Sequence, residues 1–230
     1  MTDHQHFAVV GTDTGVGKTI VTAAVVARLR ESDLDARAVK PAQTGYPPDD
    51  DAGFVAEACG TDDAATCLRR LEPPLAPAVA AEESGESLAY AEILSDCQQA
   101  LAESEVGVVE GIGGLRVPLA DGREVVDLVA DLGLPALVVA RSGLGTLNHT
   151  ALTVEALRRR GVSVTGIVLN EYEGATTAER TNPEVLAETT DATVATLPPV
   201  EFDSPAEAAA ELEVELPNSV FPDDSTTDDR

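Results

Sequence analysis

A glycine-rich segment near the start of the chain has the residues of a phosphate-binding loop. It runs Gly11-Thr12-Asp13-Thr14-Gly15-Val16-Gly17-Lys18-Thr19 and separates a short apolar run from a helical pattern. Glycines let successive backbone N–H groups converge on a phosphate, and the following helix adds the positive end of its dipole. In such loops the lysine contacts the β- and γ-phosphates and the hydroxyl ligates Mg²⁺, which here means Lys18 and Thr19. We call Gly11–Thr19 the phosphate loop, although five residues rather than the common four separate Gly11 from Gly17.

Lysine is nearly absent from the chain, and both lysines lie where an ammonium group could do chemistry. Among 15 basic residues only Lys18 and Lys40 are lysines. Lys40 follows an apolar run, which places it at the carboxyl end of a strand, where ligands bind in sheets of this kind. A compact ammonium fits between two reacting anions, whereas the wide guanidinium fork does not. We therefore expect Lys40 to act beside Lys18; the alternative is an exposed lysine at a strand end.

Acidic side chains that suit Mg²⁺ stand at two further positions. Glu110 directly follows the apolar run Val106–Val109 and precedes glycines, a place where a carboxylate needs a reason to be. The segment Asp49–Asp51 offers three carboxylates in a loop, and each is as readily explained as a solvated acidic residue. Mg²⁺ takes oxygen ligands, usually one or two carboxylates together with phosphate and water.

The elements that must position these side chains alternate along the chain. We expect strands over residues 7–10, 36–39, 106–109, 136–140, 162–169 and 193–197, and helices over 18–31, 91–103, 125–132 and 146–160. A loop is expected from Thr44 to Asp51. Apolar β-branched runs that alternate with helices predict an α/β fold, a P-loop NTPase-type sheet that is mostly parallel with helices on both faces. Residues 1–216 are expected to form one such domain, and residues 217–230 an acidic, flexible tail.

The composition narrows the class of partners. Fifteen basic and 41 acidic side chains give a net charge of −26, a field that repels nucleic-acid phosphates and anionic lipids. An ordinary acidic protein is one interpretation; adaptation to a very salty cytoplasm is the other, favoured by the lack of lysine and only 3% aromatic residues. The second predicts that structure is kept in molar KCl and lost in dilute buffer. Three cysteines without a C-x-x-C pair and the absence of a leader or membrane segment predict a cytoplasmic protein.

Together with the phosphate loop, four further segments resemble the dethiobiotin synthetase family. They are Lys40-Pro41-Ala42-Gln43-Thr44-Gly45, Asp49-Asp50-Asp51-Ala52, Glu110-Gly111-Ile112-Gly113-Gly114-Leu115 and Gly145-Thr146-Leu147-Asn148-His149-Thr150. The resemblance covers about Phe7 to Val200. It implies an ATP-dependent cyclo-ligase that carboxylates 7,8-diaminononanoate with CO₂. The intermediates it implies are a carbamate and a carbamic-phosphoric anhydride, and the products are dethiobiotin, ADP and phosphate.

The same resemblance implies a role for each matching residue. The catalytic pair would be Lys18 and Lys40, and Mg²⁺ would be held by Thr19, Asp51 and Glu110, with Asp50 as an alternative to Asp51. The implied ATP contacts are Gly15, Val16, Gly17, Lys18, Thr19, Ile20, Asp51, Glu110, Gly111, Ile112, Gly113, Asn170, Pro198, Pro199 and Val200. The implied substrate contacts are Thr14, Lys40, Thr44, Gly113, Gly114, Leu147 and Asn148. The last two would reach the substrate from the neighbouring subunit of a homodimer.

Three alternatives stay open at this point. Another ATP-dependent ligase of the same superfamily would need a glutaminase domain for which 230 residues leave no room. A nucleotide-dependent switch or partitioning ATPase is disfavoured by Asp13, which stands where those dimeric ATPases carry a second lysine. A regulatory domain that has lost activity is disfavoured because Lys18, Thr19, Lys40 and Glu110 are all present.

Overall fold

A seven-stranded parallel sheet forms the centre of the computed structural model, which describes residues 5–222. Its strands lie in the order β11-β10-β9-β1-β6-β2-β4, and every neighbouring pair is parallel. They are β1 (Phe7–Gly11), β2 (Ala36–Lys40), β4 (Ala65–Cys67), β6 (Val106–Gly114), β9 (Ala136–Arg141), β10 (Val164–Asn170) and β11 (Val194–Thr196). Two small ribbons flank the sheet: β3 (Gln43–Thr44) beside β5 (Arg70–Leu71), and β7 (Pro118–Ala120) beside β8 (Arg123–Glu124).

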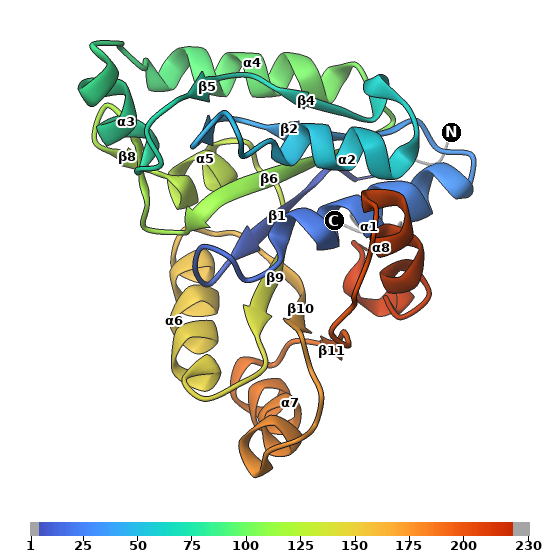
Figure 1. Cartoon of the computed structure of the whole chain (residues 1–230). Coiled ribbons are helices and arrows are strands. Elements are labelled where there is room, and N and C mark those ends of the chain that lie inside the picture. Colours follow the sequence, from blue (N-terminus) through green and yellow to red (C-terminus); the bar gives the residue numbers. More distant parts are fainter. Residues whose placement is uncertain (1–4, 223–230) are drawn as a thin grey trace, which may run out of the picture.

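Helices cover both faces of this sheet, as the sequence predicts. The helices are α1 (Lys18–Glu31), α2 (Asp51–Cys59), α3 (Pro77–Ser84), α4 (Tyr90–Ala102), α5 (Val125–Asp131), α6 (Thr146–Arg159), α7 (Thr177–Thr190) and α8 (Pro205–Glu213), with short 3₁₀ turns η1 (Asp62–Ala64) and η2 (Asn218–Val220). One core cluster joins the sheet to α1, α2 and α8, and the other joins it to α4, α5, α6 and α7. Figure 1 shows α1 and α8 side by side, with α6 away from them across the sheet. None of the helices within residues 5–222 has the length and apolar character needed to span a membrane.

The order of the strands brings the candidate residues to one edge. β6 lies between β1 and β2, with Val9 opposite Glu110 and Val39 opposite Val109. Lys40 is the residue after Val39, so it and Glu110 end up at the same level of the sheet. The phosphate loop leaves β1 at this level too. Because parallel strands share a carboxyl edge, three motifs far apart in the sequence meet there.

Most expected elements are confirmed to within two residues, and some need correction. The glycines do not end the third strand at Gly111: β6 continues to Gly114, which pairs with Gly11. The expected loop is shorter at both ends, because Thr44 belongs to β3 and Asp51 opens α2. The sequence pattern does not predict β4, α3, α7 or α8. α7 contains a proline, Pro183, and few apolar residues, so its helical period is weak.

The tail also begins later than expected. Residues 218–220 form η2, Val220 is completely buried, and Gly166 lies so close that an added Cβ there would be 3.0 Å from Val220. The ring of Phe221 packs edge-on against Phe7 at 6.4 Å between centroids. The packed body therefore reaches Phe221, five residues beyond the expected boundary at 216. The rest of the expected tail, 223–230, lies outside the described residues.

Candidate active site

The phosphate loop connects β1 to α1 with its lysine turned back over it. Lys18 Nζ donates a hydrogen bond to the backbone oxygen of Asp13 at 3.0 Å, and the side chain is buried. Gly17 begins the helix with φ at 98°, and a Cβ added there would lie 2.1 Å from the side chain of Asn170. A side chain at this position would therefore meet both backbone strain and a clash. The loop holds its lysine against its own backbone, and no carboxylate of residues 5–222 forms an ion pair with it.

A buried cluster of one lysine and two carboxylates lies next to this loop. Lys40 Nζ contacts Glu110 Oε1 at 2.8 Å and also pairs with Asp51. Thr19 Oγ1 donates to Glu110 Oε1 at 3.0 Å, which ties the cluster to the phosphate loop. Lys40 and Glu110 are 4% and 2% exposed, and they come from β2 and β6. Charges this deeply buried are stabilised only when paired and hydrogen-bonded, as these are.

The pKa values follow from burial and from this pairing. Burial and the nearby Lys40 ammonium lower the pKa of Lys18 to about 8. Burial alone would lower the pKa of Lys40, but Glu110 and Asp51 outweigh it and raise that pKa. Burial favours protonation of Asp51, but Lys40 outweighs it and lowers the pKa of Asp51. Complete burial raises the pKa of Glu110 despite the cation beside it. The site therefore contains a firmly charged Lys40 and a readily titrated Lys18.

A cavity of about 1120 Å³ opens over the loop and the cluster. Most of the residues expected at the site line it: Thr14, Gly15, Gly17, Lys18, Thr19, Ile20, Lys40, Thr44, Asp51, Ile112, Gly113, Asn170, Pro199 and Val200. Glu110 lies behind the wall, in contact with two lining residues, Thr19 and Lys40. The cavity is large enough for a nucleotide and a small second substrate.

Other expected residues lie outside this cavity. Gly111 accepts a hydrogen bond from Lys40 Nζ through its backbone oxygen, and Val16 accepts one from Asn170. Gly114 and Pro198 lie next to lining residues in the chain without lining the cavity themselves. Leu147 and Asn148 lie at the start of α6; Leu147 packs on the core and Asn148 is exposed. The structure does not bring these two together with the lysines within one chain.

The three aspartates of the 49–51 segment occupy different positions. Asp51 pairs with Lys40. Asp50 is the N-cap of α2, because its side chain accepts a hydrogen bond from the Gly53 amide at 3.0 Å. Asp49 lines the cavity nearer Gly45. This geometry favours Asp51 over Asp50 as a ligand for a cation beside Thr19.

The donor set around Thr19 suits a hard divalent cation. A hydroxyl and two carboxylates are oxygen donors of the kind that Mg²⁺ prefers, and such sites normally complete the shell with phosphate and water. Within residues 5–222 no cluster of three or more His, Cys, Asp or Glu side chains could hold a metal unaided. A cation at Thr19, Asp51 and Glu110 would therefore depend on oxygens of a bound ligand, as Mg²⁺ does with nucleotides.

The sequence reasoning missed several lining residues. Gln43 lies in the Lys40–Gly45 motif, and its side chain accepts a hydrogen bond from the Asp51 amide at 3.2 Å. Phe54 and Glu57 lie on α2 three and six residues after Asp51, so helical periodicity could have found them. Phe202 reaches the cavity from the segment between β11 and α8, and its ring contacts Phe54 edge-on at 6.1 Å. No sequence signal points to Phe202.

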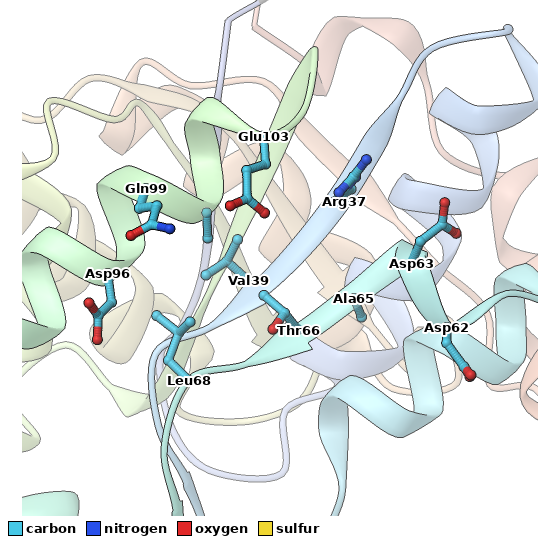
Figure 2. Close-up of a pocket in the computed structure, with 11 residues that line it drawn as sticks. Arg37, Val39, Asp62, Asp63, Ala65, Thr66, Leu68, Asp96, Gln99 and Glu103 are labelled. Atoms are coloured by element: carbon cyan, nitrogen blue, oxygen red, sulfur yellow. The ribbon is translucent and has the colours of Figure 1, made fainter.

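A second cavity, of about 390 Å³, lies between α4 and the edge of the sheet (Figure 2). Strand β2 contributes Arg37 and Val39, and Leu68 follows directly after β4. Helix α4 contributes Asp96 and Gln99. Arg37 donates to Asp35, two residues away, through Nε and Nη2 at 3.0 Å each. Both partners are partly exposed, so this cavity contains no buried charge cluster like that around Lys40.

A family model and several named relatives match this chain over most of its length. A protein-family model described as "AAA domain" matches residues 5–206. The chain is 64% identical over 218 residues to the ATP-dependent dethiobiotin synthetase BioD of Haloferax mediterranei, covering 94% of each. It is 51% identical over 170 residues to the protein of the same name from Anaeromyxobacter sp. strain Fw109-5, covering 71% of this chain and 75% of that one.

Solved structures with a similar fold have distant sequences. The septum site-determining protein MinD from Pyrococcus horikoshii, solved with Mg-ADP, superposes with a TM-score of 0.56 at 16% identity, covering 92% of this chain and 90% of that one. A ParA family ATPase from Chlorobium tepidum gives a TM-score of 0.60 at 12% identity, covering 93% and 91%. At these identities the likeness shows the fold alone, and it confirms the P-loop NTPase-type sheet.

Proposed function

The chain belongs to the dethiobiotin synthetase family, and from that premise we propose that it forms dethiobiotin from 7,8-diaminononanoate, CO₂ and ATP. The observation that carries the proposal is the meeting of two lysines from separate motifs at one cavity. Lys18 comes from the phosphate loop and Lys40 from the end of β2, and both line the same space. Few reactions need two ammonium groups beside a nucleotide; transfer of phosphate to a second anion is one of them.

The proposed reaction has three steps. One amine of the substrate adds to CO₂ and forms a carbamate. A carbamate oxygen attacks the γ-phosphorus of ATP while the bond to ADP breaks, which gives a carbamic-phosphoric anhydride. The second amine then attacks the anhydride carbon, phosphate leaves, and the ureido ring closes.

The two lysines would divide the work of charge neutralisation. Phosphoryl transfer depends mainly on positioning and on cations around the transferred group. Lys18 lies on the loop that would hold the β- and γ-phosphates. Lys40 projects from the floor of the cavity and would hold the carbamate against the γ-phosphate. The carboxylates around Lys40 keep it protonated, so it stays a cation while it binds two anions.

Thr19, Asp51 and Glu110 would hold Mg²⁺ with the nucleotide. The ion would supply positive charge that neutralises the phosphates of the nucleotide. Thr19 donates a hydrogen bond to Glu110, which orients the hydroxyl and carboxylate oxygens that would face the ion. Asp51 is held at the first turn of α2, where Gln43 accepts from its amide.

The ends of the cavity suit different parts of the ligands. Asn170, Pro199 and Val200 would contact the adenine, with Pro198 placing that segment. Thr14, Thr44, Gly113 and the adjacent Gly114 would contact the diamine or its carbamate.

Two expected substrate contacts support a homodimer. Leu147 and Asn148 stand at the start of α6, outside the cavity of their own chain. We propose that they serve the cavity of a second copy. The neighbouring Leu144 is 98% exposed, which suits a surface covered by a partner.

The charge of the chain supports a setting of high salt. A net charge of −26 and a close relative in a haloarchaeon fit a protein that works in a cytoplasm of molar KCl. In that medium the repulsion from the acidic surface is screened over a few ångströms, so an anionic nucleotide can approach.

The test is a labelled turnover assay in molar KCl. Protein, ATP, Mg²⁺ and diaminononanoate are incubated with ¹³C-bicarbonate, and ADP and dethiobiotin are measured. We expect ADP release to depend on the diamine, with the label in the ureido carbon. ADP release that ignores the diamine, without any labelled dethiobiotin, would favour a switch ATPase and refute the proposal.

A further inference from the structure

Arg141 contacts the phosphate loop and belongs to none of the five sequence motifs. It is the last residue of β9, the strand beside β1, and the Thr12 amide donates to Val139 of the same strand at 3.0 Å. Arg141 pairs in register with Asn170 on β10. The two side chains therefore leave neighbouring strands at the same level, beside the phosphate loop.

Arg141 and Asn170 together hold three successive carbonyl groups of the loop. Arg141 Nη2 donates to Thr14 O at 3.3 Å and to Gly15 O at 3.4 Å. Asn170 Nδ2 donates to Val16 O at 3.2 Å. No other carbonyl contact is made by these two side chains in the described part of the chain.

The contacts fix which way the loop amides face. In a planar trans peptide the carbonyl oxygen and the N–H of the next residue point in opposite directions. A carbonyl held by Arg141 or Asn170 therefore turns the amide of the following residue away from that side chain. The amides so turned belong to Gly15, Val16 and Gly17, and none of them donates to another group within residues 5–222. Backbone N–H groups that have no partner in the described residues are the groups with which a phosphate-binding loop holds an anion.

Within residues 5–222 the charge on Arg141 has no counterion. In a chain rich in carboxylates, most arginines of residues 5–222 form ion pairs, but Arg141 forms none and is exposed. Its partners are carbonyl oxygens only. The positive charge therefore remains available to anions held on the other side of the loop.

We propose that Arg141 is a positioning residue of the nucleotide site, which fixes the loop amides for the phosphates and adds an uncompensated positive charge behind them. The inference rests on the nucleotide site of the proposed function. Arg141 does not line the cavity, so it acts through the backbone that it holds.

The test measures binding of ADP with Mg²⁺ by calorimetry in molar KCl, without any need for turnover. The variants are R141Q, which loses the charge and the fork, and R141K, which keeps the charge but not the fork. R158Q is the matched control: Arg158 is exposed at the end of α6, and no ion pair of the described residues involves it. We expect R141Q to weaken ADP binding about tenfold, R141K about threefold, and R158Q less than twofold.

Thermal unfolding with and without ADP separates a positioning role from a general role in stability. R141Q should unfold at the same temperature as the parent protein without ADP, and should gain less from added ADP. In turnover it should raise KM for ATP and leave KM for the diamine unchanged. Equal ADP binding by R141Q and the parent would overturn the inference, and so would an equal loss in R158Q or a lower unfolding temperature of R141Q without ADP. If the parent itself bound no ADP, the proposed function would fail first.

Discussion

The large cavity over the phosphate loop and the small cavity between α4 and the edge of the sheet both contain cationic and acidic side chains, yet they differ in how the charges are held. In the large cavity, Lys40 is buried and bonded to Glu110 and Asp51, which come from a different strand and from a helix. In the small cavity, Arg37 bonds to Asp35, which lies two residues away and outside the cavity lining, and both side chains are partly exposed. The first arrangement needs the whole fold to assemble it, whereas the second needs only the segment 35–37.

Burial, and partners that come from distant segments, distinguish the charged groups that need a functional explanation. A buried ion pair gains little stability over apolar side chains of the same size, because each charge loses its hydration. Lys40 and Glu110 therefore need an explanation other than stability. A partly exposed pair between residues two positions apart costs little to form and needs no functional explanation.

The largest expected effect is that of Lys40→Ala on turnover. Without the ammonium, the carbamate and the γ-phosphate would repel each other at the moment of transfer. We expect the rate of dethiobiotin formation to fall about a thousandfold or more, with the affinity for ADP changed only a few-fold. Both are measured on the same preparation in molar KCl, by mass spectrometry and by calorimetry.

Two controls accompany this variant. Retained ADP binding shows that the site has kept its shape, and Lys40→Arg keeps the charge but should not restore turnover because its fork is too wide. A Lys40→Ala protein within tenfold of the parent rate would remove Lys40 from the mechanism and, with it, the contrast between the two cavities.

The sequence predicts the fold class and the positions of its main motifs, but not every small element around them. The phosphate loop lies between β1 and α1 and Lys40 ends β2, as predicted, because short motifs at strand ends are recognisable: backbone turns need glycine, and phosphates need cations. Once the strand order put β6 between β1 and β2, Glu110 had to meet Lys40. Contacts made by side chains from unmarked segments, such as Phe202 and Arg141, carry no such signal.

The missing elements of the fold have physical reasons too. α7 has Pro183 in its interior and a thin apolar face, so tertiary packing and its Thr176–Glu179 capping box must define it. α8 has Ser204 as its N-cap, and the Ser204 hydroxyl accepts a hydrogen bond from the Glu207 amide, a capping signal that is readable in the sequence. β4 has three residues and forms an edge, which is too short for a periodic pattern.

The next effect is a pH dependence of nucleotide affinity that comes from Lys18. In the free protein its pKa is lowered to about 8, and bound phosphates would raise it by favouring the charged form. Below about pH 8 the lysine is already charged and affinity is full. Above about pH 8 binding must take up a proton, so the affinity for ADP falls, by up to about tenfold per pH unit.

Calorimetry in buffers of different ionisation enthalpy measures the proton uptake directly. Lys18→Arg is the control, because a guanidinium does not titrate in this range and whatever affinity it keeps should be flat with pH. An affinity for ADP that stays constant from pH 7 to 9.5 in the parent protein would show that the pKa of Lys18 is not lowered by burial.

A smaller effect is expected from the ring pair that joins two walls of the large cavity. Phe54 follows Asp51 on α2, and Phe202 follows the segment 198–200 that would contact the adenine. Removing either ring breaks the contact between α2 and the segment after residue 200. Phe54→Ala and Phe202→Ala should therefore each weaken ADP binding several-fold. A double-mutant cycle should give a coupling of about 0.5–1.5 kcal/mol.

The chain provides a matched ring pair as the control. Phe7 and Phe221 make the same edge-on contact at 6.4 Å, but neither lines the large cavity. Phe221→Ala should lower the free energy of unfolding and leave the affinity for ADP unchanged. If both ring pairs affected ADP binding equally, the Phe54–Phe202 contact would have only a general role in stability.

The smallest effect belongs to the small cavity, and it tests the contrast from its other side. Arg37→Gln removes an exposed ion pair with Asp35, so the free energy of unfolding, measured with urea in molar KCl, should change by less than about 1 kcal/mol. Turnover and ADP affinity should stay at the parent values, because Arg37 lies near the start of β2, away from its carboxyl end at Lys40, and does not line the large cavity. A loss of turnover in this variant would mean that a local, solvated pair can matter as much as a buried one assembled by the fold. Unchanged turnover beside an inactive Lys40→Ala protein would instead show that burial and partners from distant segments separate the working cation from the ordinary one.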